Sequence, residues 1–416
     1  METVLFRSRR FKTGDVGPAM TLSSRPEPSP RDLPRLQVIY TAIGAGVGSL
    51  LPFLVLYLTW RGLSPTQAGL VIGMMSAVGV LAVPAWGLLA DRVLGVTRAL
   101  RLSFLLAAAG GVVLLLAGRS TPLIALSAVA LAAVRAPGEA LADTLTVVLL
   151  RDAATRFYGR VRLWASIGFA VAVAVWGFVL SRTSLALVLV AYPTAMLVAA
   201  GTVGAVRARV PAPRTSSTTI PNAAPVDNGR VLVGPFLWVL GGALVFGIGM
   251  GASITVLPLR LTAVGGGVGM VGAASVVGAV GEVPLMMFSD RLRGLWGARS
   301  VLLLGGGLFA VAMLLYGVLG VASGIVAACA VRGAGYALVY VGFVLTVGML
   351  LPPGLQARGQ ALLQTTLMGV APIVGASLGG YAFSHTSSGL LFGTCGALVL
   401  GGAGLACGGV RHARST

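Results

Sequence analysis

Apolar stretches long enough to cross a lipid bilayer recur along the whole sequence, and they constrain the fold more than any other feature. A spanning helix needs about 20 apolar residues. Charged residues make up 10% of the chain, against about 25% in a soluble domain, so they cannot cover a water-facing surface. We therefore expect an all-α membrane protein of twelve transmembrane helices. Windows of the required length predict them near residues 37–60, 65–90, 99–118, 121–150, 161–182, 184–205, 232–256, 265–288, 300–318, 321–350, 360–383 and 388–409.

Basic residues are distributed unevenly between the two sides that these spans define. Of the 30 lysines and arginines, 24 fall on the side of both termini and two fall inside spans, while Arg61, Arg119, Arg182 and Arg260 fall on the opposite side. The positive-inside rule then places both termini in the cytoplasm of a multi-pass cell-membrane protein. Anionic lipid headgroups account for the net charge of +19, so we expect no nucleic-acid partner.

Polar segments divide the chain into parts. The first segment is rich in Arg and Pro and lacks the apolar core of a signal peptide, so we expect a disordered cytoplasmic tail. A second polar segment, rich in Pro, Ser and Thr, separates the spans six and six. The predicted organisation is a tail at 1–36, an N-terminal six-helix bundle at 37–205, a cytoplasmic linker at 206–231, a C-terminal six-helix bundle at 232–409 and a cytoplasmic tail at 410–416.

The two predicted bundles resemble each other in sequence. AVRAPGEAL (residues 133–141) and AVRGAGYAL (residues 330–338) are identical at six of nine positions, at an offset of 197 residues. ADRVLG and SDRLRG, at the ends of the second and eighth predicted helices, are 199 residues apart. Because each half has an even number of spans, this is a parallel repeat, which predicts a solute site near the midplane between two pseudo-symmetric bundles.

The loop GLLADRVLGVTRALR resembles the G-x-x-x-D-R-x-G-R-K/R signature of the major facilitator superfamily. Its matching residues are Gly87, Asp91, Arg92 and Arg98, although the second glycine comes one position late and two residues are added before Arg98. In that family the charges form a cytoplasmic latch between the halves. The resemblance therefore implies a gating set of Asp91, Arg92, Arg98, Asp290 and Arg291. The alternative is a charge cluster that only fixes topology.

Three further segments resemble the lactose-permease, nucleoside-permease and phenylpropionate-permease branch of that superfamily. They are YGRVRLWASIGF (158–169), PFLVLYLTWRGLS (52–64) and GEVPLMMFSDRL (281–292). The resemblance implies that Arg162 binds solute hydroxyls, that Phe169 stacks on a solute ring and that Asp143 is the acidic partner. The lactose permease's charged residues on helices 7, 10 and 11 have no counterparts here, so its sugar specificity and proton relay do not carry over.

Three charged residues share one face of the fourth predicted helix. Arg135, Glu139 and Asp143 are spaced i, i+4 and i+8 and extend about 12 Å along a helix axis. Ionisable residues inside a membrane normally face a cavity and pair with one another. We expect Arg135 to pair with Glu139, which leaves Asp143 for Arg162 on the next helix. This face then either lines the solute path or is a structural network that holds helices together.

Glu282 is the one acidic residue inside the spans of the second half. Its apolar neighbours favour the neutral, protonated carboxyl, which suits a group that takes up and releases a proton. Arg332 is its one obvious charged partner within the spans, so a static Glu282–Arg332 pair is the alternative. The predicted proton-coupling residues are Glu282 and Asp143. The predicted substrate-binding residues are Arg135, Glu139, Asp143, Arg162, Phe169 and Arg332.

The sequence favours transport over catalysis. It contains no P-loop pattern and no cluster of nucleophile and base, so we expect no enzyme and no cofactor, with a proton gradient as the energy source. The cysteines Cys329, Cys395 and Cys407 fall in apolar spans and indicate neither a disulfide nor a metal site. We expect a monomer that carries a small organic solute (a sugar, nucleoside or aromatic acid) by proton-coupled symport. The alternatives are proton-driven efflux of a drug or natural product and a non-transporting sensor on a carrier scaffold.

Overall fold

The computed structural model describes residues 32–150, 154–206 and 234–415, without the side chains of residues 32, 154–156, 289–296, 353 and 410–415. Within these residues the chain is helical without strands, and twelve stretches are long and apolar enough to span a membrane. The expected all-α membrane fold is confirmed. The N-terminal half consists of α1 (Asp32–Trp60), α2 (Pro65–Leu89), the π-helix η1 (Ala90–Leu94), α3 (Val96–Leu116), α4 (Thr121–Arg135), α5 (Pro137–Leu150), α6 (Ala154–Leu180), η3 (Leu185–Leu187) and α7 (Val188–Ala205). The C-terminal half consists of α8 (Gly234–Ala263), α9 (Val268–Met287), α10 (Ser289–Val318), α11 (Ala322–Leu350), α12 (Pro353–Gln364), the π-helix η5 (Thr365–Val370), α13 (Ala371–His385) and α14 (Ser388–Ser415).

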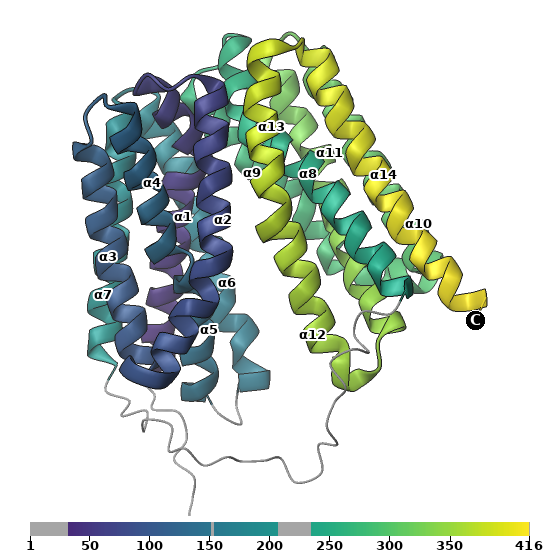
Figure 1. Cartoon of the computed structure of the whole chain (residues 1–416), viewed down its shortest axis with the longest axis horizontal. Helices are drawn as coiled ribbons and strands as arrows, with labels where there is room; N and C mark the ends of the chain where they lie inside the picture. Colours follow the sequence, from purple (N-terminus) through teal and green to yellow (C-terminus); the bar gives the residue numbers. More distant parts are fainter. Residues whose placement is uncertain (1–31, 151–153, 207–233, 416) are drawn as a thin grey trace, which may run out of the picture.

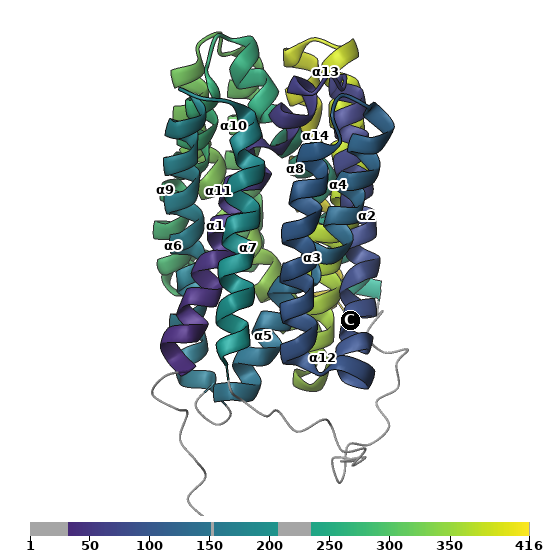
Figure 2. The same ribbon diagram turned by 90° about the vertical axis from the view of Figure 1, so that its left-hand side faces the viewer.

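The helices form two bundles that lie side by side (Figure 1). Figure 2, in which the N-terminal half faces the viewer, shows that the helices of both bundles run along one common direction. The start of α1 and the end of α14 lie at the same end of the molecule, which we call the terminal end; the other is the distal end. In Figure 1 the bundles approach each other toward the distal end and diverge toward the terminal end.

Two glycine–glycine crossings join the halves near the distal end. A Cβ placed on Gly69 of α2 would lie 2.8 Å from the Cα of Gly380 of α13, and one placed on Gly272 of α9 would lie 3.0 Å from the Cα of Gly177 of α6. An offset of 203 residues relates Gly69 to Gly272 and also Gly177 to Gly380. The two crossings are therefore copies of one contact, and their missing side chains let the backbones meet closely.

Two arginines at the distal end also show the internal repeat. Arg61, just after α1, donates hydrogen bonds to the carbonyls of Leu115 (2.5 Å) and Gly118 (2.9 Å) at the end of α3. Arg260 of α8 donates in the same way to the carbonyls of Tyr316 (3.1 Å) and Leu319 (3.0 Å) at the end of α10. Each guanidinium satisfies carbonyls that lack a partner at a helix C-terminus and places positive charge at the negative end of the dipole.

The structure adds local detail to three predicted spans. The span predicted at 121–150 is found at Thr121–Leu150. Ala136, between α4 and α5, keeps helical angles (φ −54°, ψ −39°) and a hydrogen bond to the Ala132 carbonyl, and Pro137 after it removes one N–H from the helix. The repeat partner of this span, α11, is continuous, and Ala334 stands where the other half has Pro137. The span predicted at 300–318 is found at Gly297–Val318, and the non-helical Gly297 (φ 70°, ψ 162°) separates it from a helical segment that begins at Ser289. The helix predicted at 360–383 begins at Pro353 and contains the π-helical turn η5.

Candidate functional site

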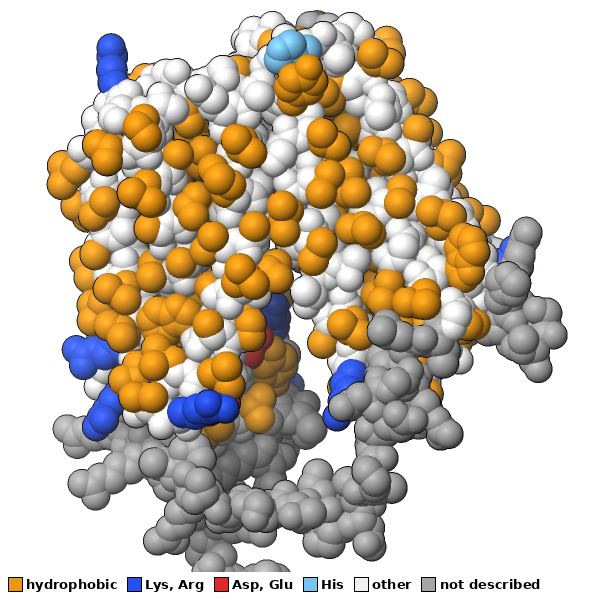
Figure 3. Space-filling view, viewed as in Figure 1, with side chains coloured by type: hydrophobic (Ala, Val, Ile, Leu, Met, Phe, Trp, Pro, Cys, Tyr) orange, Lys and Arg blue, Asp and Glu red, His pale blue; other side chains and the backbone are white. Residues whose placement is uncertain are grey.

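A cavity of about 820 Å³ lies between the two halves. Figure 3 shows the cleft between them, with basic and acidic side chains visible in its wall, open toward the terminal end. The lining comes from α1, α2, α3, α4, α5 and α7 of the N-terminal half and from α12 and η5 of the C-terminal half. Most lining residues are apolar. The polar ones are Ser76, Arg135, Glu139, Asp143, Tyr192, Gln364 and Thr365.

Prolines interrupt the hydrogen bonding of three helices around this cavity. Pro84 lies within α2, Pro137 begins α5 and Pro372 follows η5. Each proline removes the N–H that would bond to the carbonyl four residues earlier. Two of those carbonyls belong to Val80 and Met368, which line the cavity. Irregular backbone at membrane depth is tolerated where it lines a water-filled cavity, and such interrupted helices are typical of solute sites in transporters.

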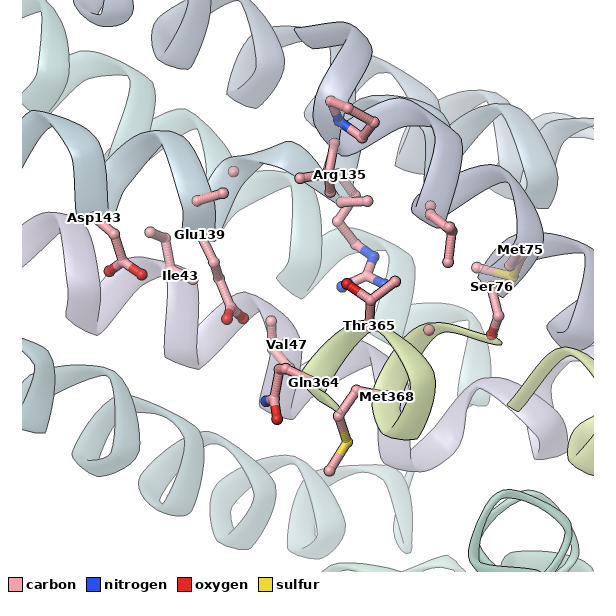
Figure 4. A pocket seen from close by; sticks show the side chains of 18 of the residues that line it. Ile43, Val47, Met75, Ser76, Arg135, Glu139, Asp143, Gln364, Thr365 and Met368 are labelled. Carbon is pink, nitrogen blue, oxygen red and sulfur yellow. The ribbon is translucent and has the colours of Figure 1, made fainter. Parts of the chain in front are cut away.

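Arg135 and Glu139 both line the cavity but form no salt bridge with each other or with any other described residue. The Nε atom of Arg135 is buried without a hydrogen-bond partner. In Figure 4 the Arg135 guanidinium points toward Thr365, whereas the Glu139 carboxylate points toward Gln364. The predicted Arg135–Glu139 pair is therefore wrong. The i, i+4 spacing puts both residues on one helix face, but Figure 4 shows their charged groups directed to different parts of the cavity wall.

Asp143 is the centre of a hydrogen-bonded network on the same wall. Arg162 Nη1 donates to both Asp143 oxygens at 3.1 Å, so the predicted pair is present. The hydroxyl of Tyr40, a fully buried residue of α1, donates to Asp143 Oδ1 at 2.5 Å and accepts from Thr146 Oγ1 at 3.3 Å. The network ties α1, α5 and α6 together and neutralises the Asp143 charge. Tyr40 was not predicted as a member of this network, because one tyrosine in an apolar span is usually a packing residue.

The remaining predicted binding residues are not among those that line this cavity. Phe169 is half-buried on α6, where its backbone packs against Gly44 and Gly48 of α1. Glu282 and Arg332 lie at the α9–α11 contact, both half-buried. No salt bridge within 4.0 Å joins these two described residues, so the static pair weighed from the sequence is absent in this conformation.

The predicted gating charges lie at the terminal end of α2. Asp91 and Arg92 belong to η1 and Arg98 lies in the first turns of α3, and all three side chains are exposed. Asp91 forms no salt bridge with either arginine or with another described residue. Asp290 and Arg291 begin α10, and their side chains lie outside the described residues. A latch role for this set stays a prediction.

Comparison with known proteins identifies the family. Residues 33–394 match the family model described as the MFS_1 like family. The chain belongs to this family. It is 31% identical over 271 residues to the maltose permease of Geobacillus stearothermophilus, a match that covers 64% of this chain and 66% of that permease. It is 26% identical over 274 residues to the uncharacterized transporter YwbF of Bacillus subtilis (strain 168), covering 65% of this chain and 67% of that protein.

Solved structures agree with this MFS_1-like membership at the level of the fold. The nucleoside transporter NupG has a TM-score of 0.71 and 14% identity, covering 91% of this chain and 99% of its own. An auto-inhibited POT family peptide transporter has a TM-score of 0.73 and 12% identity, covering 92% and 97%. The predicted major facilitator fold is confirmed, and the protein is a multi-pass membrane transporter rather than an enzyme.

Proposed function

We propose that this transporter takes up a neutral, polyhydroxylated solute, with sugars as the leading class, by alternating access and proton-coupled symport. The observation that carries the proposal is the charge balance of the cavity. Arg135 contributes an unpaired positive charge, Glu139 an unpaired negative charge, and Asp143 with Arg162 a neutral pair. A solute with a net charge would leave one charge uncompensated at membrane depth, where this is costly. A neutral solute leaves the net charge of the cavity residues and the solute together at zero.

The polar groups of the cavity suit hydroxyls in particular. A guanidinium only donates hydrogen bonds, whereas a carboxylate and free backbone carbonyls only accept them. A hydroxyl does both, so a solute with several hydroxyls can satisfy both kinds of group at once. The cavity volume of about 820 Å³ lies within the range of about 300–1,000 Å³ that is usual for small-molecule sites. The match to a maltose permease supports the same class.

Energy coupling is proposed to involve Glu282 and Asp143. Glu282 lies on α9 among apolar residues without a salt bridge to a described residue, a setting that favours uptake and release of a proton. Asp143 lies in the cavity wall, where solute can alter its contacts. The proposed orientation puts the terminal end in the cytoplasm of the cell, by the distribution of basic residues.

A ligand-stabilisation screen of the purified transporter tests the proposed class. The panel contains neutral sugars, nucleosides, aromatic acids and antibiotics. Ligand at 100 times its Kd stabilises a protein by about 2.7 kcal/mol, so neutral sugars should raise the Tm. Stabilisation by charged solutes alone would overturn the charge argument. Flux into proteoliposomes then separates uptake from efflux, and a sensor would bind solute without any flux.

A further inference from the structure

The C-terminal half reaches the cavity through one short segment. Its lining residues are Gln364, Thr365, Met368 and Gly369, at the end of α12 and in η5. Gln364 and Thr365 are the polar members, and both side chains are exposed. Two other polar residues of this segment, Gln360 and Thr366, do not line the cavity.

Neither side chain has a hydrogen-bond partner among the described residues, which is also true of the adjacent Thr366. Gln360, one turn earlier on α12, donates from Nε2 to the carbonyl of Val344 at 3.0 Å. Several threonines elsewhere in the spans bond to the carbonyl four residues earlier, as Thr255 and Thr346 do at 2.8 and 2.7 Å. Gln364 and Thr365 thus keep their hydrogen-bonding capacity free at the cavity surface.

The backbone that holds them is locally irregular. The N–H of Ala371 bonds to the carbonyl of Thr366, five residues earlier, which makes η5 a π-helical turn. Such turns are frequent at functional sites. Pro372 follows directly, so the irregularity is encoded in the sequence and leaves a carbonyl of this turn without its usual donor.

The opposite wall carries the unpaired charges of the N-terminal half. Figure 4 shows Arg135 directed toward the side of Thr365, and Glu139 toward that of Gln364. A solute held by Arg135 and Glu139 therefore has free polar groups of the other half across the cavity. Approach of the terminal ends of the halves would bring these two sets of groups closer together around the solute.

We propose that Gln364 and Thr365 are specificity-determining residues through which the C-terminal half binds the solute, so that the solute bridges the two halves and draws their terminal ends together. This inference rests on the proposed function. A ligand shifts a conformational equilibrium only as far as it binds one state better than the other. Contacts made only in the closed state supply that difference, whereas contacts to Arg135 and Glu139 alone do not.

Paired substitutions on the same segment test the proposal. Gln364→Ala and Thr365→Val remove the proposed contacts. Gln360→Ala and Thr366→Val are the matched controls. Gln360 lies one turn before Gln364 and Thr366 is adjacent to Thr365, but neither residue lines the cavity. Thr365→Ser keeps the hydroxyl and should keep wild-type affinity. The Tm of each variant without solute establishes that it is folded.

Binding is measured by calorimetry with maltose, sucrose and lactose. Closure is measured as the distance between spin labels at Val93 on η1 and Ala361 on α12, both exposed. A hydrogen bond is worth about two- to tenfold in affinity. We expect each test variant to lose about that much and to show less sugar-induced shortening of the distance, while both controls match the wild type.

The outcomes separate the two proposals. If the wild type binds a sugar and the test variants bind and close as the controls do, the inference is overturned and the proposed function stands. If the wild type binds none of the three sugars, the proposed function fails and the inference fails with it.

Discussion

Leucine at both Gly69 and Gly272 is expected to shift this transporter from its terminal-open conformation to one that is open at the distal end. These glycines are the two copies of one contact, at which α2 meets α13 and α9 meets α6. A side chain at either position meets backbone of the opposite half, which cannot move aside as a flexible side chain could. Separation of the distal ends relieves both clashes at once.

The magnitude follows from the geometry of the crossings. A Cβ at Gly69 or Gly272 would lie 2.8 or 3.0 Å from a Cα of the opposite half, closer than ordinary van der Waals contact. Overpacking costs about 1–3 kcal/mol at a site. The double variant should therefore destabilise the present conformation by about 2–6 kcal/mol relative to a distal-open one. At 1.4 kcal/mol per factor of ten, this changes the ratio of conformations by about 30-fold to about 10⁴-fold.

Disulfide cross-linking at the distal end measures this shift. Thr66 Oγ1 and Ser384 Oγ are 3.2 Å apart across the halves, so cysteines at these two positions should cross-link readily in the present conformation. The three native cysteines are buried and form no disulfide, and they can be replaced beforehand. The Gly69→Leu/Gly272→Leu background should slow cross-linking at least tenfold.

Gly401→Leu is the control, because an added Cβ there meets nothing within 4 Å. It should leave the cross-linking rate unchanged. Equal rates in the control and in the double leucine variant would refute the assignment of these crossings as the distal closure.

Three other substitutions test separate parts of the structure. Tyr40→Phe removes the hydrogen bond to Asp143 and should destabilise the protein by about 1 kcal/mol, seen as a lower Tm; an unchanged Tm would show that the bond contributes nothing. Glu282→Gln should abolish accumulation driven by a pH gradient yet spare exchange of solute for solute, and retained accumulation would remove Glu282 from coupling. Arg162→Ala should weaken equilibrium solute binding at least tenfold, because it leaves Asp143 without its cation; unchanged affinity would make the pair purely structural.

The architecture could be predicted from the sequence because it depends on regular signals. Span length and the asymmetry of basic residues reflect the properties of the bilayer, which act on every helix in the same way. The repeated AVRxxGxAL segments show the internal repeat directly. The Asp143–Arg162 pair was predictable as well. This pair requires only that two oppositely charged residues on adjacent helices lie at the same depth in the membrane.

Features that depend on where single side chains point were missed. Arg135 and Glu139 share a helix face, but Figure 4 shows their charged groups directed to different parts of the cavity wall, which helical spacing does not determine. Gln364 and Thr365 were not predicted, because the apolar pattern of the helix does not indicate which of its polar side chains face the N-terminal half. Polar residues followed by Pro372 were the available signal. The spacing of Arg135, Glu139 and Asp143 did locate the N-terminal wall, since all three line the cavity.

The most direct test of a neutral, polyhydroxylated solute is a comparison of maltose with its acid analogue maltobionate in proteoliposomes. Uptake of each is measured for the wild type and for Glu139→Gln, which removes the unpaired negative charge of the cavity. We predict that the wild type takes up maltose in preference to the acid, and that Glu139→Gln shifts this ratio at least tenfold toward the acid. An unchanged ratio, or a wild type that prefers the acid, would contradict the charge balance on which the proposed function rests.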